Sequence, residues 1–71
     1  MKTILLTGSN GLLGQKIVQA LRSRGDVKII ATSAGENRML NKEGYTYETL
    51  DITNQQQVKN IISKYKPDAL I

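Results

Sequence analysis

The sequence predicts an α/β fold, the first half of a doubly wound parallel sheet, on three observations. Apolar runs at residues 3–7, 27–32 and 68–71 have few polar interruptions, which is typical of parallel strands covered by helices on both faces. The segments at 12–24 and 53–66 place their apolar residues at helical spacing. Three glycines, at positions 8, 11 and 14, lie between the end of the first apolar run and the first turn of the first helical segment. Strands and helices therefore alternate along the chain.

The chain of 71 residues contains no Cys and no His. This composition excludes disulfides, thiolate nucleophiles, imidazole bases and nearly all transition-metal sites, so we assign no metal ligand. It is compatible with a reducing compartment, and we expect a cytoplasmic protein. Because single domains usually have roughly 100–150 residues, we expect residues 1–71 to be an incomplete N-terminal part of one domain.

The net charge of +4, from 10 basic and 6 acidic residues, would suit an anionic partner such as nucleic acid. The basic residues are scattered singly or in short pairs, such as Arg22 with Arg24, and no aromatic side chains lie between them as stacking platforms. A solvated helix face explains them better, so we expect no nucleic acid partner. The first apolar run ends at Thr7 and is too short for a signal peptide or a membrane span, so we expect no membrane association.

The first strand comprises residues 3–7 and leads directly into the glycines. From Leu12 the apolar residues recur at steps of three and four, which predicts an amphipathic helix. The apolar face of this helix would consist of Leu13, Ile17, Ala20 and Leu21. Gly25 suits a left-handed C-terminal cap, and Arg22 and Arg24 place positive charge where the helix dipole favours it. The helix is therefore expected to end at Gly25.

The next part of the chain contains two further predicted strands. Residues 27–32 predict a buried strand, and residues 45–50, which are rich in aromatic and β-branched side chains, predict another. Between these strands, residues 33–44 are mostly polar or glycine, with Met39 and Leu40 as the large apolar residues, and predict a loop with one short helical turn.

A second helix is predicted after the third strand, because Thr53 and Gln56 fit a capping box. The apolar positions that follow at helical spacing are Val58, Ile61, Ile62 and Tyr65. Lys66 and Pro67 would end this helix, and residues 68–71 begin a fourth apolar strand.

This order of elements predicts the first half of a Rossmann domain. Right-handed crossovers between parallel strands would give the strand order 3-2-1-4, with the first and fourth strands as neighbours. Ligands of such sheets bind at the C-terminal ends of the strands where the winding reverses. We therefore expect a binding crevice between the first and fourth strands.

The glycine-rich segment Gly8-Ser9-Asn10-Gly11-Leu12-Leu13-Gly14 is predicted to bind the pyrophosphate of a dinucleotide. Gly8 would allow a sharp turn, Gly11 a close approach of the backbone to a phosphate, and Gly14 close packing of the helix on the sheet. The free N–H groups of Leu12 and Leu13, at the helix N-terminus, would point at the pyrophosphate. The candidate residues of this turn are Gly8, Asn10, Gly11, Leu12, Leu13 and Gly14.

Two other interpretations of the glycines are less consistent with the sequence. Asn10-Gly11 is a strong signal for a two-residue hairpin turn, but the residues from Leu12 onward have helical and not alternating periodicity, so no return strand follows. A Walker-type phosphate loop is excluded because no Gly-Lys-Ser/Thr follows the turn.

The end of the second strand determines which dinucleotide is expected. NAD sites normally place Asp or Glu there to bind the ribose 2′-hydroxyl, but this chain has Thr32 and Ser33. Ser33 and Arg38 could donate hydrogen bonds to a 2′-phosphate, so NADP is favoured over NAD. Arg38 could equally be a solvent-exposed loop residue, and Glu36 could bind the ribose and favour NAD.

Asp51 lies at the end of the third strand, where its carboxylate would face the same crevice. It could accept a hydrogen bond from the amino group of adenine. Alternatively, Asp51 simply helps to start the next helix beside Thr53.

The segments TGSNGLLGQ (residues 7–15), Asp51-Ile52 and KPDALI (residues 66–71) resemble the N-terminal part of the extended short-chain dehydrogenases/reductases. The resemblance covers the whole chain. It implies that Asp51 and Ile52 line the adenine pocket. It further implies that the parent protein reduces a keto group of a nucleotide-activated deoxysugar with NADPH. Nucleotide-sugar epimerases and dehydratases share this N-terminal half, as do non-catalytic dinucleotide-binding regulatory subunits, and both remain alternatives.

Enzymes that this chain resembles transfer protons with a Tyr-x-x-x-Lys pair. The residues four positions after Tyr45, Tyr47 and Tyr65 are Thr49, Asp51 and Ala69. We therefore assign no catalytic residue, and we expect the chain by itself to bind a cofactor at most, without turnover. The sequence makes no prediction of the oligomeric state.

Overall fold

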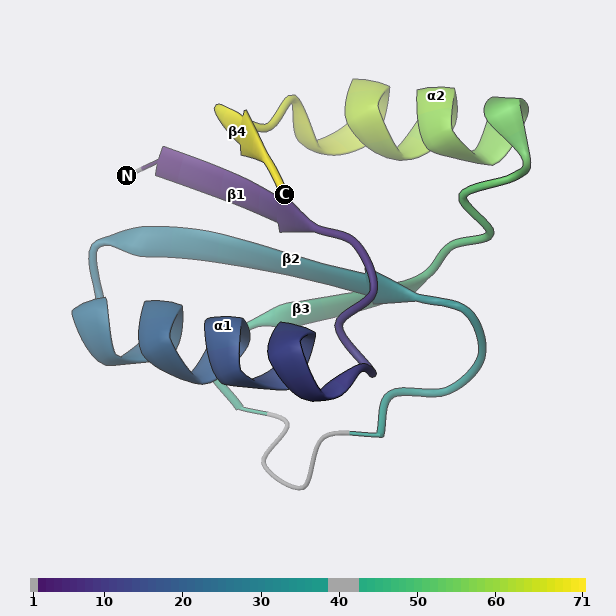
Figure 1. Ribbon diagram of the computed structural model, residues 1–71. Helices are drawn as coiled ribbons and strands as arrows, with labels where there is room; N and C mark the ends of the chain where they lie inside the picture. Colours follow the sequence, from purple (N-terminus) through teal and green to yellow (C-terminus); the bar gives the residue numbers. More distant parts are fainter. Residues whose placement is uncertain (1, 39–42) are drawn as a thin grey trace.

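The computed structural model describes residues 2–38 and 43–71. Within these residues, four strands and two helices alternate in the order β1 (Lys2–Leu6), α1 (Leu12–Arg24), β2 (Val27–Ser33), β3 (Thr46–Thr49), α2 (Gln55–Tyr65) and β4 (Ala69–Leu70). All strand pairs are parallel, and the sheet order is β3-β2-β1-β4 (Figure 1). The predicted fold class and strand order are confirmed.

The two helices lie on opposite sides of the sheet (Figure 1). Leu6 of β1 pairs with Ala31 of β2, and both are buried in one cluster with Val18 of α1. Leu5, one residue earlier, lines a groove with Ile61 on the α2 side. Because successive strand residues point to opposite faces, this arrangement explains why β1 and β2 contain almost continuous apolar runs.

The buried face of α1 agrees only in part with the predicted one, because Ile17 packs against the buried cluster as expected but two other predicted residues do not. Leu13 is 72% exposed and Ala20 is also exposed, whereas Gly14 and Val18 are buried. Gly14 lies against the backbone of the glycine turn. Since residues four apart share a helix face, this contact places Val18 over the sheet and rotates Leu13 away from it. The apolar spacing identified the helix, but the turn determined its rotation.

The C-terminus of α1 is as predicted. Gly25 adopts the left-handed conformation (φ 73°), and Arg22 and Arg24 lie in the last turn. By contrast, the predicted capping box of α2 is wrong. Asn54 and not Thr53 is the N-cap, because the Asn54 side chain accepts hydrogen bonds from the N–H groups of Gln56 and Gln57. The helix ends at Lys66, which is in the left-handed conformation just before Pro67.

Helix α2 has no buried residue and is attached to the sheet partly by polar contacts. The Glu48 carboxylate on β3 accepts hydrogen bonds from the Lys64 ammonium group (2.7 Å) and from the Tyr65 hydroxyl. These bonds lower the pKa of Glu48 below its usual value, and the bond from Lys64 has the largest effect. The ammonium groups of Lys28 and Lys64 lie 5.7 and 5.1 Å from the centre of the Tyr65 ring. This polar cluster connects the last turn of α2 to β3.

Two details of the predicted elements are adjusted. The third strand is shorter than residues 45–50, although Leu50 is still buried just beyond its end. Met39 and Leu40, where a short helical turn was expected, lie outside the described residues. Neither helix in the described part of the chain is long and apolar enough to cross a membrane.

Candidate functional site

The glycine-rich turn joins the C-terminal end of β1 to the start of α1. Gly8 has a positive φ of 69°, a conformation that L-residues with side chains rarely adopt. The Ser9 N–H donates a hydrogen bond to the Thr32 carbonyl (2.9 Å), and the Gly11 N–H donates to the Gly8 carbonyl (3.1 Å). The turn is therefore closed on itself and tied to the C-terminal end of β2.

The N-terminus of α1 is open. Its N-cap, Gly11, has extended backbone angles (φ −71°, ψ 161°), no side chain in the described structure caps the helix, and its first turn contains no acidic residue. The first N–H groups of an α-helix have no intrahelical acceptor, and they carry the positive end of the helix dipole. The backbone at Leu12 and Leu13 is therefore a suitable site for an anion.

The three glycines of the turn differ in whether the fold needs them. A Cβ atom on Gly14 would lie 2.3 Å from the Gly8 carbonyl oxygen and 2.8 Å from the Ser9 Cα atom, so no side chain fits there. The contact is with the turn itself and not with the sheet as expected. A Cβ on Gly11 would lie 3.5 Å from the same oxygen, which is an ordinary contact. The fold therefore requires glycine at positions 8 and 14 but not at position 11.

The loop that follows β2 lies directly beside the turn. Ser33 ends β2, and the Asn10 side chain forms hydrogen bonds with backbone groups of Ala34, Glu36 and Arg38. The structure thus brings Ser33 and Arg38 to the same edge of the sheet as the glycine turn. Thr32 is fully buried, and its hydroxyl donates to the Leu6 carbonyl (2.7 Å), so Thr32 has a structural role.

Asp51 takes the alternative role that the sequence left open. Its Oδ1 atom accepts hydrogen bonds from both the hydroxyl (2.6 Å) and the N–H (3.0 Å) of Thr53. These bonds lower the pKa of the exposed Asp51 carboxyl, and the bond from the Thr53 hydroxyl has the largest effect. Asp51 therefore stabilises the turn that leads into α2, and any contact with adenine would be additional to this role.

Ile52 is 65% exposed and borders an apolar groove of about 240 Å³ between α2 and the sheet. The groove is lined by Leu5, Thr7, Leu50, Ile52, Val58, Ile61, Ile62 and Leu70. Thr7 marks the end of the groove nearest the glycine turn, and both its N–H and its hydroxyl donate to the Ile71 carbonyl (2.8 and 2.9 Å). The first and fourth strands are neighbours at this edge, as predicted.

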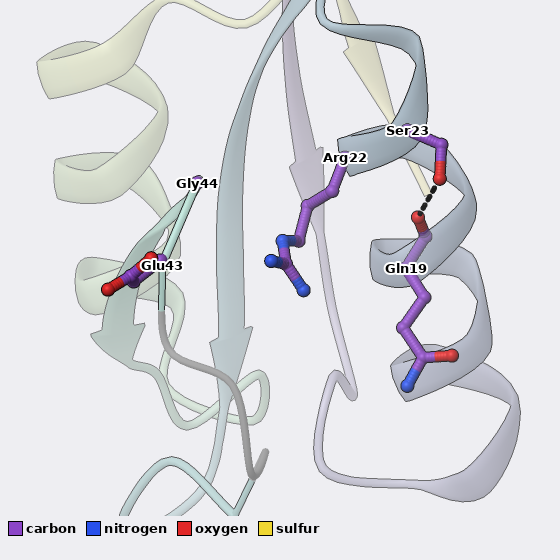
Figure 2. Close-up of a pocket in the computed structure, with 5 residues that line it drawn as sticks. All are labelled: Gln19, Arg22, Ser23, Glu43 and Gly44. Atoms are coloured by element: carbon purple, nitrogen blue, oxygen red, sulfur yellow. Dashed lines mark hydrogen bonds between the residues drawn. The ribbon is translucent and has the colours of Figure 1, made fainter.

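A separate polar hollow of about 500 Å³ lies beside the C-terminal half of α1, at the other end of the helix from the glycine turn. Figure 2 shows Arg22 extending from α1 toward Glu43 and Gly44. The Ser23 hydroxyl donates back to the Gln19 carbonyl within the helix (3.1 Å). This hollow contains none of the predicted site residues.

The predicted site residues thus gather along one edge of the sheet, at the C-terminal ends of β1, β2 and β3. The sequence did not reveal how Asn10 connects them. Its hydrogen-bond partners are 24 to 28 residues away along the chain, so no local pattern could identify them.

A family model described as "NAD dependent epimerase/dehydratase family" matches residues 4–71. The chain belongs to this family. Its match includes the glycine turn, the loop after β2, most of β1 and the other three strands. The sequence was expected to be an N-terminal segment similar to the extended short-chain dehydrogenases/reductases. The match confirms this expectation at the level of the family.

Several known proteins are similar to the chain over nearly all of its length. A dTDP-4-dehydrorhamnose reductase of Aggregatibacter actinomycetemcomitans is 31% identical over 71 residues, which are 100% of this chain and 20% of the relative. The solved L-threonine dehydrogenase of Clostridium difficile has 31% identity and a TM-score of 0.81, covering 99% of this chain and 23% of that protein. The Bordetella bronchiseptica enzyme WbmH, solved in complex with NAD⁺, has 27% identity and a TM-score of 0.81. The match covers 99% of this chain and 24% of WbmH. The chain therefore spans about a quarter or less of the length of these proteins.

Proposed function

We propose that this chain binds the pyrophosphate of NADP(H) at the glycine turn and the open N-terminus of α1. The observation that carries the proposal is Gly11. Gly11 has backbone angles that any residue can adopt, and a Cβ atom would fit at this position. The fold itself therefore does not need glycine at this N-cap. Side chains that cap helices are usually favoured at such a position. A bare N-cap instead lets a phosphate approach the backbone N–H groups closely.

The proposed choice of NADP over NAD depends on the loop after β2. Ser33 and Arg38 lie at the edge of the sheet where the ribose of the adenosine would bind, and no carboxylate stands at the end of β2 to repel a 2′-phosphate. Glu36 lies in the same loop and is the residue that would favour NAD. The family description and the NAD⁺ bound to WbmH support a dinucleotide cofactor, and both name NAD, so the choice of NADP rests on the loop residues alone.

For the parent protein we propose reduction of a keto group on a nucleotide-activated deoxysugar, as in dTDP-4-dehydrorhamnose reductase. The 31% identity to that enzyme supports this assignment. The family description supports a nucleotide-sugar epimerase or dehydratase as the second candidate. When bound, the nicotinamide ring supplies the hydride chemistry, and the residues of this chain hold and orient the adenosine and pyrophosphate groups. A Tyr-x-x-x-Lys pair elsewhere in the parent protein distinguishes these enzymes from a non-catalytic dinucleotide-binding subunit.

Fluorescence titration of NADPH and of NADH with the chain tests the binding proposal, with circular dichroism to monitor folding. We expect saturable binding that is tighter for NADPH. Gly11→Val should weaken both cofactors by at least about a hundredfold, or about 2.7 kcal/mol, because its side chain blocks the approach of the phosphate. Ser23→Val, which adds the same side chain at the opposite end of α1, is the control and should bind like the wild type. Unchanged affinity in a folded Gly11→Val variant would contradict the proposed site.

A further inference from the structure

The Asn10 side chain is hydrogen-bonded through both ends of its amide group to a single loop. Its Nδ2 atom donates to the Glu36 carbonyl (2.8 Å) and, over a longer distance, to the Ala34 carbonyl (3.3 Å). Its Oδ1 atom accepts from the Arg38 N–H (2.9 Å). A side chain with both donors and an acceptor can satisfy three backbone groups in this way. Asn10 therefore acts as a bridge between the glycine turn and residues 34–38.

The same loop is held from its other side by β3. The Tyr47 hydroxyl donates to the carbonyl groups of Gly35 (2.8 Å) and Ser33 (3.1 Å), and the Thr49 hydroxyl also donates to the Gly35 carbonyl (3.1 Å). These bonds fix the beginning of the loop. At the end of the described loop, the Asn37 side chain donates to the Tyr45 hydroxyl (2.8 Å), and the bond from the Arg38 N–H to Asn10 ties the backbone of Arg38 directly to the glycine turn.

Asn10 is held in turn by the structure that surrounds it. Its own carbonyl accepts a hydrogen bond from the Gln15 side chain on α1 (2.8 Å), and the preceding residue, Ser9, is tied to β2. The position of the Asn10 amide is thus determined by the turn and the helix. The position of Arg38 then follows from the position of the amide.

We propose that Asn10 is a positioning residue that sets the distance between the pyrophosphate-binding turn and Arg38, and thereby the preference for a cofactor with a 2′-phosphate. This inference rests on the proposed function. The turn and the loop would bind two parts of one rigidly spaced ligand, the pyrophosphate and the adenosine ribose. Groups that are fixed in the right geometry before binding lose less entropy when the ligand arrives. Asn10 therefore contributes to selectivity without touching the phosphate.

The test measures the dissociation constants of NADPH and NADH for the wild type and for Asn10→Asp and Asn10→Leu. Both variants have nearly the size of Asn10 but lack the Nδ2 donor, and the carboxylate of Asp would also face two carbonyl oxygens. Loss of one charge-assisted contact corresponds to roughly a tenfold change. For Asn10→Leu we expect NADPH to bind about tenfold more weakly and NADH nearly as before, so the preference for NADPH falls. Asn10→Asp also places a negative charge beside the pyrophosphate-binding turn, so it should weaken both cofactors, and NADPH more than NADH. Asn54→Ala, which removes the cap of α2, is the control for a general loss of stability and should leave the ratio unchanged.

A double-mutant cycle identifies the residue through which Asn10 acts. In an Arg38→Ala background, Asn10→Leu should have no further effect on NADPH, because the group that it positions is absent. Additive effects of the two substitutions, or an unchanged NADPH/NADH ratio in the Asn10 variants, would overturn the inference. A wild type that binds neither dinucleotide would overturn the proposed function instead.

Amide hydrogen exchange of the wild type tests the bridge without any variant or cofactor. The Arg38 N–H should be protected, because it is bonded to Asn10. An Arg38 amide that exchanges at the rate of an unstructured peptide would refute the positioning role, even if the dinucleotides bind.

Discussion

The two helices of this chain begin in opposite ways. Helix α2 is capped by Asn54, whose side-chain oxygen accepts hydrogen bonds from the N–H groups of Gln56 (3.1 Å) and Gln57 (3.2 Å). Helix α1 is preceded by Gly11, and no described side chain caps it. Asn10, the asparagine of the glycine turn, lies immediately before that N-cap, but its side-chain amide is hydrogen-bonded to the loop after β2.

This difference agrees with a stability role for the start of α2 and with the binding role that we propose for the start of α1. Helix α2 has no buried residue, so it depends on its cap and on polar contacts at its C-terminus. Helix α1 is held by the burial of Gly14 and Val18 and does not need a cap. Its N–H groups are therefore left for an external anion, which is the chemistry that the glycine turn predicts.

The largest effect is expected at Gly14, on which the packing of α1 depends. Gly14→Ala should lower the free energy of unfolding by about 3 kcal/mol, because the new Cβ atom collides with the backbone of the turn. Gly11→Ala is the matched control, and we expect a change of no more than about 0.5 kcal/mol there. Urea denaturation followed by circular dichroism measures both. Equal losses in the two variants would show that the turn relaxes easily around Gly14.

A side-chain cap at the N-terminus of α1 should make this helix start resemble that of α2. Gly11→Asp places a good N-cap residue in backbone angles that suit it. The free energy of unfolding should rise by about 0.5 kcal/mol, while NADPH binding weakens by about a hundredfold, or about 2.7 kcal/mol, because the carboxylate occupies the anion site. Chemical denaturation and fluorescence titration measure the two effects. A stabilised variant with full affinity would contradict the assignment of this helix terminus to the pyrophosphate.

Removing the cap from α2 should affect stability alone. Asn54→Ala should cost about 1 kcal/mol of unfolding free energy, because two N–H groups lose their acceptor. Asn54→Asp retains an acceptor and should remain within about 0.5 kcal/mol of the wild type. Thermal denaturation of the three proteins gives the comparison. If the alanine variant is as stable as the wild type, α2 is not held by its cap.

The smallest effect is expected at the other end of α2, where Glu48 is bonded to Lys64 and Tyr65. Because these bonds lower the pKa of Glu48 in the folded state, the carboxylate stabilises the fold above its usual pKa. This contribution is lost as the pH falls through the lower, folded-state pKa. Glu48→Gln should therefore be slightly less stable than the wild type at about pH 7, by less than about 1 kcal/mol, and this difference should shrink as the pH falls below the usual pKa of a glutamate carboxyl. Glu36→Gln, in the loop after β2, is the control, and a difference at Glu48 that does not depend on pH would exclude the ionic contribution.

Most of the fold was predictable because it depends on local patterns. Apolar runs, one segment rich in aromatic and β-branched residues, and helical spacing identified all the strands and helices of the described chain. The glycines after β1 place the candidate site at the C-terminal ends of the strands, and its binding role stays a prediction. The errors concern side chains with more than one partner available. Thr53 and Asn54 are both good N-cap residues, and Thr53 is instead bonded to Asp51.

The sequence by itself determined the order of the elements, the sheet topology and the open N-terminus of α1, because each follows from residue periodicity and from glycine at a fixed position. The tertiary structure decided the rotation of α1, through the contact of Gly14 with the turn, and the role of Asn10. Both depend on close contacts between backbone segments that come together only after the strands have paired. Whether such contacts form depends on differences of a few tenths of an ångström in the positions of backbone segments. Residue type alone does not encode these positions.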